Sequence, residues 1–396
     1  MHPIAPSAWP LDPELTFLNH GSFGACPHEV LAAQQALRAR IERQPVQFYV
    51  RELLDLIDAA RERVAAFLGA DPAGLVFVRN ATSGVNAVLR SLNFNAGDEI
   101  LVTDHGYAAC EYAARFVAQR AGARVVVARL PFPGLTPDAV LDAVLDAVTP
   151  RTRLAMLDHI TSPTGVVLPI ARLIDALRAR GVDTLVDGAH GPGMLPLDLN
   201  ALGAAWYTAN LHKWVCAPKG AAVLVVRPDH RAGLHPAVIS HGHRFPLTPG
   251  GRSRLHWEFD WPGTDDPTPW LCAPVALDFF ARQPGGWAAV QARGRKLALA
   301  GREAICAALG VEPPCPPEMI GTLAAIPLPD APTDEPPPDS PLYTSPLQQY
   351  LLDKHRIEVP IVPWPAHPQR LVRFSAAPYN VLAEYERLTA ALREAL

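Results

Sequence analysis

The sequence has no clustered positive charge and no long apolar run. Its 35 basic and 39 acidic residues leave a net charge of −4, and no block of like charges stands out. Nucleic-acid surfaces and anionic-membrane anchors need clustered lysine and arginine, so neither kind of partner is expected. No stretch of about 18 apolar residues occurs, so no membrane span is expected. The segment 1–13 lacks a basic stretch followed by an apolar one, so no signal peptide is expected either.

Cysteine is sparse and scattered. Six cysteines are spread over 396 residues and none forms a CxxC pair, so we expect neither a disulfide framework nor a zinc site, and the reducing cytoplasm is the default location. Cys26 and Cys110 lie near candidate site segments, and we interpret both as buried structural thiols. His241 and His243 have a metal-like spacing without an accompanying cluster of acids or cysteines. We interpret that pair as a loop feature and predict no metal.

Lysine is rare, with four residues in the chain, whereas proline is abundant, with 42. The densest proline stretch lies within 327–346. Patterned sequence resumes after it, so we predict an extended surface loop inside a domain rather than a disordered tail.

Hydrophobic periodicity predicts strands that alternate with helices. After two early amphipathic helices, short β-branched runs recur, and helical stretches of about ten to fifteen residues separate most of them. Such alternation is typical of an α/β fold with a mainly parallel sheet covered by helices on both faces. The seven expected strands are 75–78, 99–103, 124–128, 154–157, 184–186, 206–209 and 221–226.

The pattern changes near residue 268. Residues 242–266 are rich in Gly, Pro, Arg and Trp, which predicts a loop. The sequence after it predicts a small α+β domain. Its expected elements are a mostly helical stretch 270–309, strands 320–326, 358–362 and 371–375, and helices 346–355 and from 381 onward. We therefore predict a large domain, 15–268, and a small C-terminal domain, 269–396, joined by the N-terminal segment 1–14.

Polar residues follow several of the predicted strands, where ligands bind in open parallel sheets. The first strand is followed by Ala81 and Thr82 at a helix start, where free N–H groups and the positive dipole end suit a phosphate. An ordinary N-cap is the alternative for this position. The fifth strand is followed by Asp187 and His190. The carboxylate is either a helix cap or the partner of a protonated pyridine nitrogen.

Lys213 lies just past the sixth predicted strand, between apolar and aromatic neighbours. Such surroundings exclude water and lower the pKa of a lysine, as a Schiff-base amine requires. Taken alone, a surface lysine in a turn is the simpler interpretation. Its combination with Asp187 and Thr82 at strand ends of one sheet favours a cofactor site. After the second strand, His105 or Tyr107 is placed to stack on a flat ring.

These motifs together resemble the class V aminotransferase family of pyridoxal 5′-phosphate (PLP) enzymes, fold type I, and in particular its isopenicillin N epimerase-like branch. The resemblance covers nearly the whole chain. The motifs that carry it are Phe17-Leu18-Asn19-His20-Gly21-Ser22-Phe23-Gly24, Asn80-Ala81-Thr82, Ser162-Pro163-Thr164-Gly165, Asp187-Gly188-Ala189-His190, Asn210-Leu211-His212-Lys213-Trp214, Gly263-Thr264-Asp265 and Arg373-Phe374-Ser375.

The resemblance implies roles for single residues. Lys213 resembles the catalytic lysine that forms the Schiff base, and Asp187 resembles the partner of the pyridine nitrogen. His190 resembles the neighbour of the ring and its phenolic oxygen. Arg373 resembles the arginine that binds the substrate α-carboxylate in a bidentate fork, with a structural salt bridge as the alternative.

The remaining implied contacts involve both cofactor and substrate. His105 matches the stacking histidine of cysteine desulfurases, whereas Tyr107 is typical of the epimerase-like branch, and the choice between them stays open. Asn19 and His20 lie in the glycine-rich turn where the family's substrate approaches. The other implied cofactor contacts are Ala81, Thr82, Ser162, Asn210 and His212, together with Thr264, which in the family reaches the phosphate of the neighbouring subunit.

The implied function is PLP-dependent chemistry at the α-carbon of an amino acid. The main expectation is an isopenicillin N epimerase-like reaction, and the alternatives are C–S lyase chemistry or transamination. The desulfurase route is not expected, because 357–361 contains no cysteine before the carboxylate-binding arginine. A non-catalytic PLP-fold binding protein is the remote alternative, but it would have lost Lys213, Asp187 or Arg373. The family also implies a homodimer with its site at the subunit interface.

Overall fold

The computed structural model describes residues 3–247, 251–340 and 343–396. Parts of three predicted segments, the N-terminal segment, the loop before residue 268 and the proline-rich loop, therefore lie outside the described residues. These parts are residues 1–2, 248–250 and 341–342.

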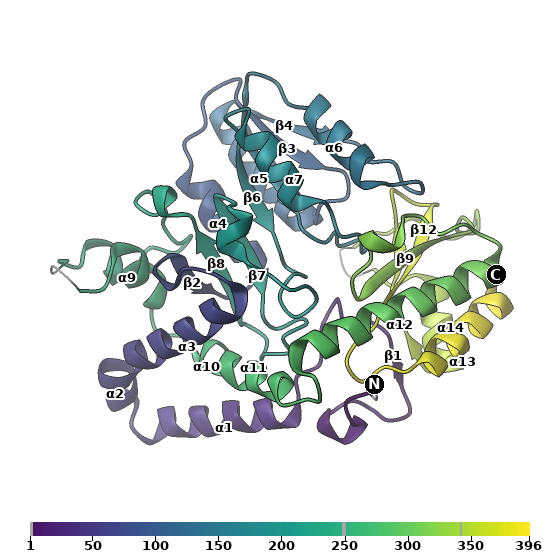
Figure 1. The fold of residues 1–396 in the computed structure, drawn as a ribbon, viewed down its shortest axis with the longest axis horizontal. Coiled ribbons are helices and arrows are strands. Elements are labelled where there is room, and N and C mark those ends of the chain that lie inside the picture. Colours follow the sequence, from purple (N-terminus) through teal and green to yellow (C-terminus); the bar gives the residue numbers. More distant parts are fainter. Residues whose placement is uncertain (1–2, 248–250, 341–342) are drawn as a thin grey trace.

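A seven-stranded sheet forms the centre of the larger part of the molecule (Figure 1). Its strands are β2 (Leu75–Val78), β3 (Glu99–Thr103), β4 (Arg124–Ala128), β5 (Thr152–Asp158), β6 (Asp183–Asp187), β7 (Trp206–Asn210) and β8 (Ala222–Val226). They lie in the order β2-β8-β7-β6-β5-β3-β4, and neighbours are parallel except where β8 pairs with β2 and β7. No long helix joins β7 to β8, so β8 returns antiparallel. The predicted strands and mainly parallel sheet are confirmed.

Both faces of the sheet are buried. Alternate residues of a strand point to opposite faces. Leu75 and Phe77 of β2 accordingly pack in one apolar cluster, and Val76 and Val78 pack in another. The helices that accompany the sheet are α1 (His28–Arg43), α3 (Leu53–Leu68), α4 (Ala81–Ser91), α5 (Ala108–Ala121), α6 (Pro137–Asp146), α7 (Ile170–Arg178), α10 (Thr268–Leu271) and α11 (Ala273–Ala281).

A second, smaller layer of strands and helices follows in the chain. Its antiparallel sheet has the order β11-β12-β9, and the long helix α12 starts beside α11 and packs on β9 (Figure 1). The elements are α12 (Gly286–Leu309), β9 (Leu323–Leu328), α13 (Pro346–His355), β10 (Ile357–Glu358), β11 (Ile361–Pro363), β12 (Arg370–Ser375) and α14 (Leu382–Ala395). Among the described residues, no helix is long and apolar enough to span a membrane.

The division of the chain into domains at residue 268 stays a prediction. Many contacts cross it, including two between regular elements. The early strand β1 (Thr16–Phe17) pairs in parallel with β10 of the C-terminal part. Helices α10 and α11, which follow residue 268, pack on α1 and α3 of the N-terminal part.

The prediction that 242–266 is only a loop was wrong, because it contains the helix α9 (Arg254–Asp260). Ser253 caps this helix by accepting a hydrogen bond from the backbone N–H of His256. Tertiary ion pairs then hold α9 against α3. The buried carboxylate of Asp260 pairs with Arg61 of α3 and with Arg252. The composition of this segment, rich in turn-forming residues, does not predict a helix whose stability depends on distant ion-pair partners.

We predict that Asp260→Asn destabilises the protein by about 3 kcal/mol, because it removes the buried one of the two carboxylates, Asp58 and Asp260, that pair with Arg61 and Arg252. The free energy of unfolding from urea titrations measures this. The exposed Arg63–Asp278 pair supplies the matched control. Asp278→Asn is expected to cost less than about 1 kcal/mol. Equal losses in the two variants would contradict a structural role for the buried pair.

Candidate active site

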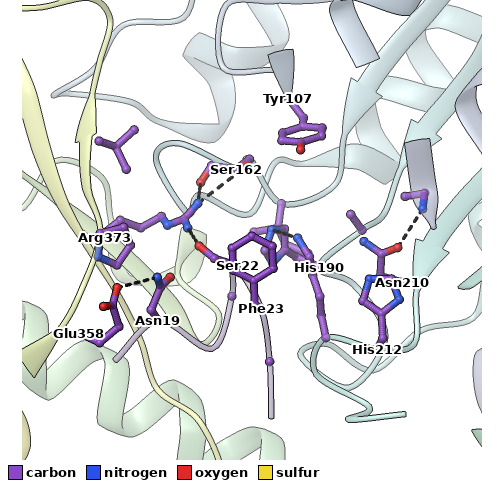
Figure 2. A pocket seen from close by; sticks show the side chains of 18 of the residues that line it. Asn19, Ser22, Phe23, Tyr107, Ser162, His190, Asn210, His212, Glu358 and Arg373 are labelled. Atoms are coloured by element: carbon purple, nitrogen blue, oxygen red, sulfur yellow. Dashed lines mark hydrogen bonds between the residues drawn. The ribbon is translucent and has the colours of Figure 1, made fainter. Parts of the chain in front are cut away.

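A cavity of about 830 Å³ lies at the carboxyl ends of the central strands, and β12 of the C-terminal part closes one side. Figure 2 shows the side chains that converge there from separate elements. Most residues predicted for the site line this cavity. They are Asn19, Ala81, Thr82, Tyr107, Ser162, Asp187, His190, Asn210, His212, Lys213 and Arg373.

The last residues of β5, β6 and β7 form one edge of the cavity: Asp158, Asp187 and Asn210. Asp158 and Asp187 are register partners in neighbouring parallel strands. Asp187 accepts hydrogen bonds from the Ala189 N–H at 3.0 Å and the Cys110 thiol at 3.1 Å. Burial, followed by the nearby Asp187 charge, raises the pKa of Asp158 well above its ordinary value. Burial also raises the pKa of Asp187, so both carboxyl groups bind a proton more readily than exposed ones do.

Sequence reasoning missed Asp158, because the predicted strand stopped one residue short of it. An acid at the end of a buried run, in register with Asp187, was the available signal. Cys110 is buried, as expected for a structural thiol, and its bond to Asp187 adds a polar contact that the sequence did not reveal.

The start of α4 forms a second side of the cavity. Asn80 caps the helix by accepting from the Ser83 N–H at 2.8 Å, and Asn210 accepts from the Ala81 N–H at 2.8 Å. A Cβ atom at Gly84 would lie 2.1 Å from Oγ1 of Thr208, so only glycine lets α4 pack this closely on β7. The helix start and its positive dipole end are thereby held beside Asn210, in an arrangement that suits a phosphate.

His212 lies beside this helix start (Figure 2). Its Nδ1 is 2.9 Å from the carbonyl oxygen of Ala221, and a carbonyl can only accept, so Nδ1 carries a proton. Burial lowers the pKa of His212 to about 4. In the neutral ring the Nε2 atom is therefore unprotonated.

Lys213 lies on the turn between β7 and β8 and is mostly buried. Its Nζ atom is 3.0 Å from Nε2 of His190. Burial, followed by the positive charge of Arg373, lowers the pKa of Lys213 to about 8. A substantial fraction of the amine is therefore neutral near pH 8, as nucleophilic attack on an aldehyde requires.

Arg373 enters the cavity from β12 and is only 7% exposed. Its guanidinium donates to the backbone oxygen of Ser162 and to Oγ of Ser22, as Figure 2 shows. Its Nε has no hydrogen-bond partner, and no acidic side chain of the described residues forms an ion pair with it. Burial lowers its pKa to about 10, so the group stays charged. A buried cation without an acidic partner favours an anionic ligand.

Three predicted residues lie elsewhere. His20 is fully buried behind the cavity, where its ring nitrogens contact the Tyr379 hydroxyl at 2.9 Å and the Lys213 carbonyl oxygen at 3.1 Å. Its surroundings place it to support the Lys213 turn rather than to touch a substrate. Thr264 is exposed and does not line the cavity of its own chain. Its predicted contact with a neighbouring subunit stays a prediction.

His105 is the third predicted site residue that lies outside the cavity. It is buried, with Nδ1 2.8 Å from Oγ1 of Thr164 and its ring edge-on to Phe132 and Trp364. Tyr107 instead lines the cavity and is about half exposed. Of the two candidates for ring stacking, only Tyr107 therefore presents its ring to the space where a cofactor would lie.

The expectation that no carboxylate accompanies the His241 and His243 pair was wrong for His243. Helix α9 brings the buried carboxylate of Glu258 to 3.3 Å from Nδ1 of His243 and 2.7 Å from Nδ1 of His235. Potential ligand atoms of these three residues lie within 4.8 Å of one another. The cluster lies outside the set of residues that line the main cavity.

The cavity residues fit PLP. A buried lysine with a lowered pKa, a buried carboxyl group, a helix start and an arginine without an acidic partner surround one space. These are the groups needed to hold an aldehyde, a pyridine nitrogen, a phosphate and a substrate carboxylate. The aldehyde would be held by Lys213, the pyridine nitrogen by Asp187, and the phosphate by Thr82 and its neighbours.

Comparison with known proteins agrees with this assignment. The family model described as aminotransferase class-V matches residues 24–313. The isopenicillin N epimerase of Amycolatopsis lactamdurans is 39% identical, over 97% of this chain and 96% of that protein. A probable chloroplastic L-cysteine desulfhydrase of Arabidopsis thaliana is 32% identical, over 96% of this chain and 83% of that protein.

Solved structures show the same fold at lower identity. A cysteine desulfurase from Escherichia coli superposes with a TM-score of 0.77 at 23% identity, over 98% of this chain and 96% of that chain. The cystine C–S lyase C-DES superposes with a TM-score of 0.78 at 22% identity, over 96% of this chain and 98% of that chain. The fold expected from the resemblance is confirmed. With its family model covering most of its length, the chain belongs to the class V aminotransferase family and is a PLP-dependent enzyme.

Proposed function

We propose that the protein removes and returns the α-proton of an amino acid, in an isopenicillin N epimerase-like reaction. One observation carries the proposal. Arg373, a buried guanidinium without an acidic partner, and Lys213, a buried amine with a lowered pKa, line the same cavity. The first suits an α-carboxylate, and the second suits both the attachment of PLP and proton transfer at the neighbouring carbon.

The chain's own residues supply binding, orientation and proton transfer. Bound PLP supplies an electron sink for a bond at the α-carbon. Asp187 would keep the pyridine nitrogen protonated, and the start of α4 with Asn210 would hold the phosphate. Tyr107 would cover one face of the ring. With PLP bound, the Lys213 amine would be the base that accepts the α-proton.

Arg373 would orient the substrate. Its guanidinium is held in place by Ser22 and Ser162, so it need not lose side-chain freedom when a carboxylate binds. Asn19 donates to Oε1 of Glu358 at 3.2 Å and lines the same wall (Figure 2). This fixed wall would aim the α-hydrogen toward Lys213.

The reach of the cavity favours an amino acid with a long side chain. Beyond Arg373 the cavity extends to residues of α13 and of the segment before it. Several of the lining side chains there are polar: Tyr343, Thr344, Gln348 and Gln349. A three-carbon substrate such as cysteine leaves this region unused.

C–S lyase chemistry is the second candidate. The relatives named as L-cysteine desulfhydrases match nearly the whole chain, and the steps up to removal of the α-proton would be shared. The two reactions diverge only afterwards, when the α-carbon is reprotonated or a β-substituent leaves.

We predict that the enzyme exchanges the α-hydrogen of suitable amino acids for deuterium in D₂O, which proton NMR measures directly. Lys213→Ala should lose the visible Schiff-base absorbance band and slow exchange by about 100- to 10,000-fold, the usual contribution of a positioned base. Exchange should rise with pH through about 8, because only the neutral amine accepts a proton. The exposed Lys296→Ala variant is the matched control.

The same incubations separate the candidate reactions. A panel of amino acids with short and long side chains is assayed for the D-isomer, for pyruvate with sulfide, and for the aminated cofactor. Accumulation of the D-isomer supports epimerisation, and pyruvate with sulfide from cysteine supports the lyase. If Lys213→Ala keeps both the absorbance band and the exchange, the proposed function is wrong.

We also propose a homodimer with its site at the subunit interface, in the cytoplasm. Phe23, which lines the cavity, has a large apolar side chain that is 76% exposed on the single chain. A second subunit would cover this side chain at the cavity. Thr264, exposed and outside its own cavity, would then contact the partner's phosphate.

The dimer prediction has two measurements. Light scattering should give twice the chain mass, and Thr264→Ala should weaken PLP binding without changing that mass. The expected loss is about 1 kcal/mol, or roughly fivefold, for one hydrogen bond. A monomer that binds PLP fully would contradict the proposal.

A further inference from the structure

A chain of two hydrogen bonds runs from Trp214 to Lys213 through His190. The indole Nε1 of Trp214 donates to Nδ1 of His190 at 3.2 Å. Nε2 of the same imidazole lies 3.0 Å from Nζ of Lys213. The side chains of Trp214 and His190 are buried, and that of Lys213 is mostly buried. The expected role of His190 near the cofactor ring does not account for the indole behind it.

The direction of these bonds follows from the chemistry of the donors. An indole N–H can only donate, so Nδ1 of His190 must accept and carries no proton. Burial, followed by the charges of Lys213, Arg373 and His20, lowers the pKa of His190 well below its ordinary value, so the ring is neutral. Its single proton is therefore on Nε2, and the Nε2–H group points at the Lys213 nitrogen.

We propose that Trp214 is a positioning residue that fixes the tautomer of His190, so that the imidazole donates a hydrogen bond to the Lys213 nitrogen and favours the neutral amine. A neutral amine has a lone pair that accepts this bond, whereas an ammonium group does not. For its catalytic consequence, the inference rests on the proposed function. The tautomer itself is a property of the protein without cofactor.

The indole is held firmly enough for this role. It packs in a buried cluster with Ile160, Met194 and Leu323. A Cβ atom at Gly193 would lie 2.6 Å from the carbonyl carbon of Trp214, so the backbone of residue 214 is tightly enclosed. The N–H group therefore cannot swing away from His190 without repacking the cluster.

Other charged groups also face Lys213 and influence its pKa. Arg373 opposes protonation of the amine, whereas Asp187, Cys110 and Asp158 favour it. None of these groups is altered by a change at position 214. Without the indole donor, His190 can carry its proton on Nδ1 and accept at Nε2 from the ammonium group. The pKa of Lys213 should then rise.

The test uses Trp214→Phe in the apoenzyme, with ¹⁵N-labelled histidine and lysine. Histidine ¹⁵N shifts report which ring nitrogen carries the proton, and a His190→Gln variant assigns the signal. The chain has only four lysines, so the Lys213 amine can be followed in a pH titration. We expect His190 to lose its Nε2–H preference. The pKa of Lys213 should rise by about 0.5 to 1 unit, the equivalent of one hydrogen bond.

Trp206→Phe is the matched control, because Trp206 is also buried but its Nε1 has no hydrogen-bond partner. It should leave both signals unchanged. If Trp214→Phe does not fold, the sulfur isostere benzothienylalanine at position 214 removes the N–H group and keeps the shape. If the His190 tautomer and the Lys213 pKa stay unchanged in the folded variant at position 214, the inference is overturned. A wild-type protein that forms no Schiff-base band with PLP overturns the proposed function instead.

Discussion

The parallel alignment of β5, β6 and β7 is the constraint on which the candidate site depends. Because their carboxyl ends meet at one edge, Asp158, Asp187 and Asn210 lie side by side, although long stretches of chain separate them. The antiparallel return of β8 then places Lys213 on the turn that leaves the same edge. The three strand-end groups are held by backbone ladders rather than by flexible loops, so this edge of the cavity is largely preformed.

Burial gives these groups their chemistry. Lys213 and Arg373 are two cations in one low-dielectric space, and the arginine charge opposes protonation of the lysine. On the opposite side, Asp158 and Asp187 oppose each other's ionisation. Such paired like charges cost stability, but they move proton affinities toward the range in which a catalyst works. A bound cofactor and a carboxylate substrate would neutralise these charges and so reduce the cost in stability.

Much of the fold could be predicted from the sequence, because strands buried on both faces leave strong apolar runs. β2, β3 and β4 begin and end where the pattern indicated. The helix α9 could not be predicted, since its stability comes from Asp260 meeting Arg61 some 200 residues away in the chain. Periodicity records local preference and burial, and it contains no information about such distant ion pairs.

For the site, the sequence by itself determined the chemical inventory: Lys213, Asp187 and Arg373 are specified by motifs that local patterns and family resemblance expose. Only the tertiary structure decided how these groups act. It turned His105 away from the cavity, left Tyr107 facing it, and set the direction of the bonds from Trp214 to His190. The reason is physical: proton positions and pKa values depend on neighbours and burial, which exist only once the chain is folded.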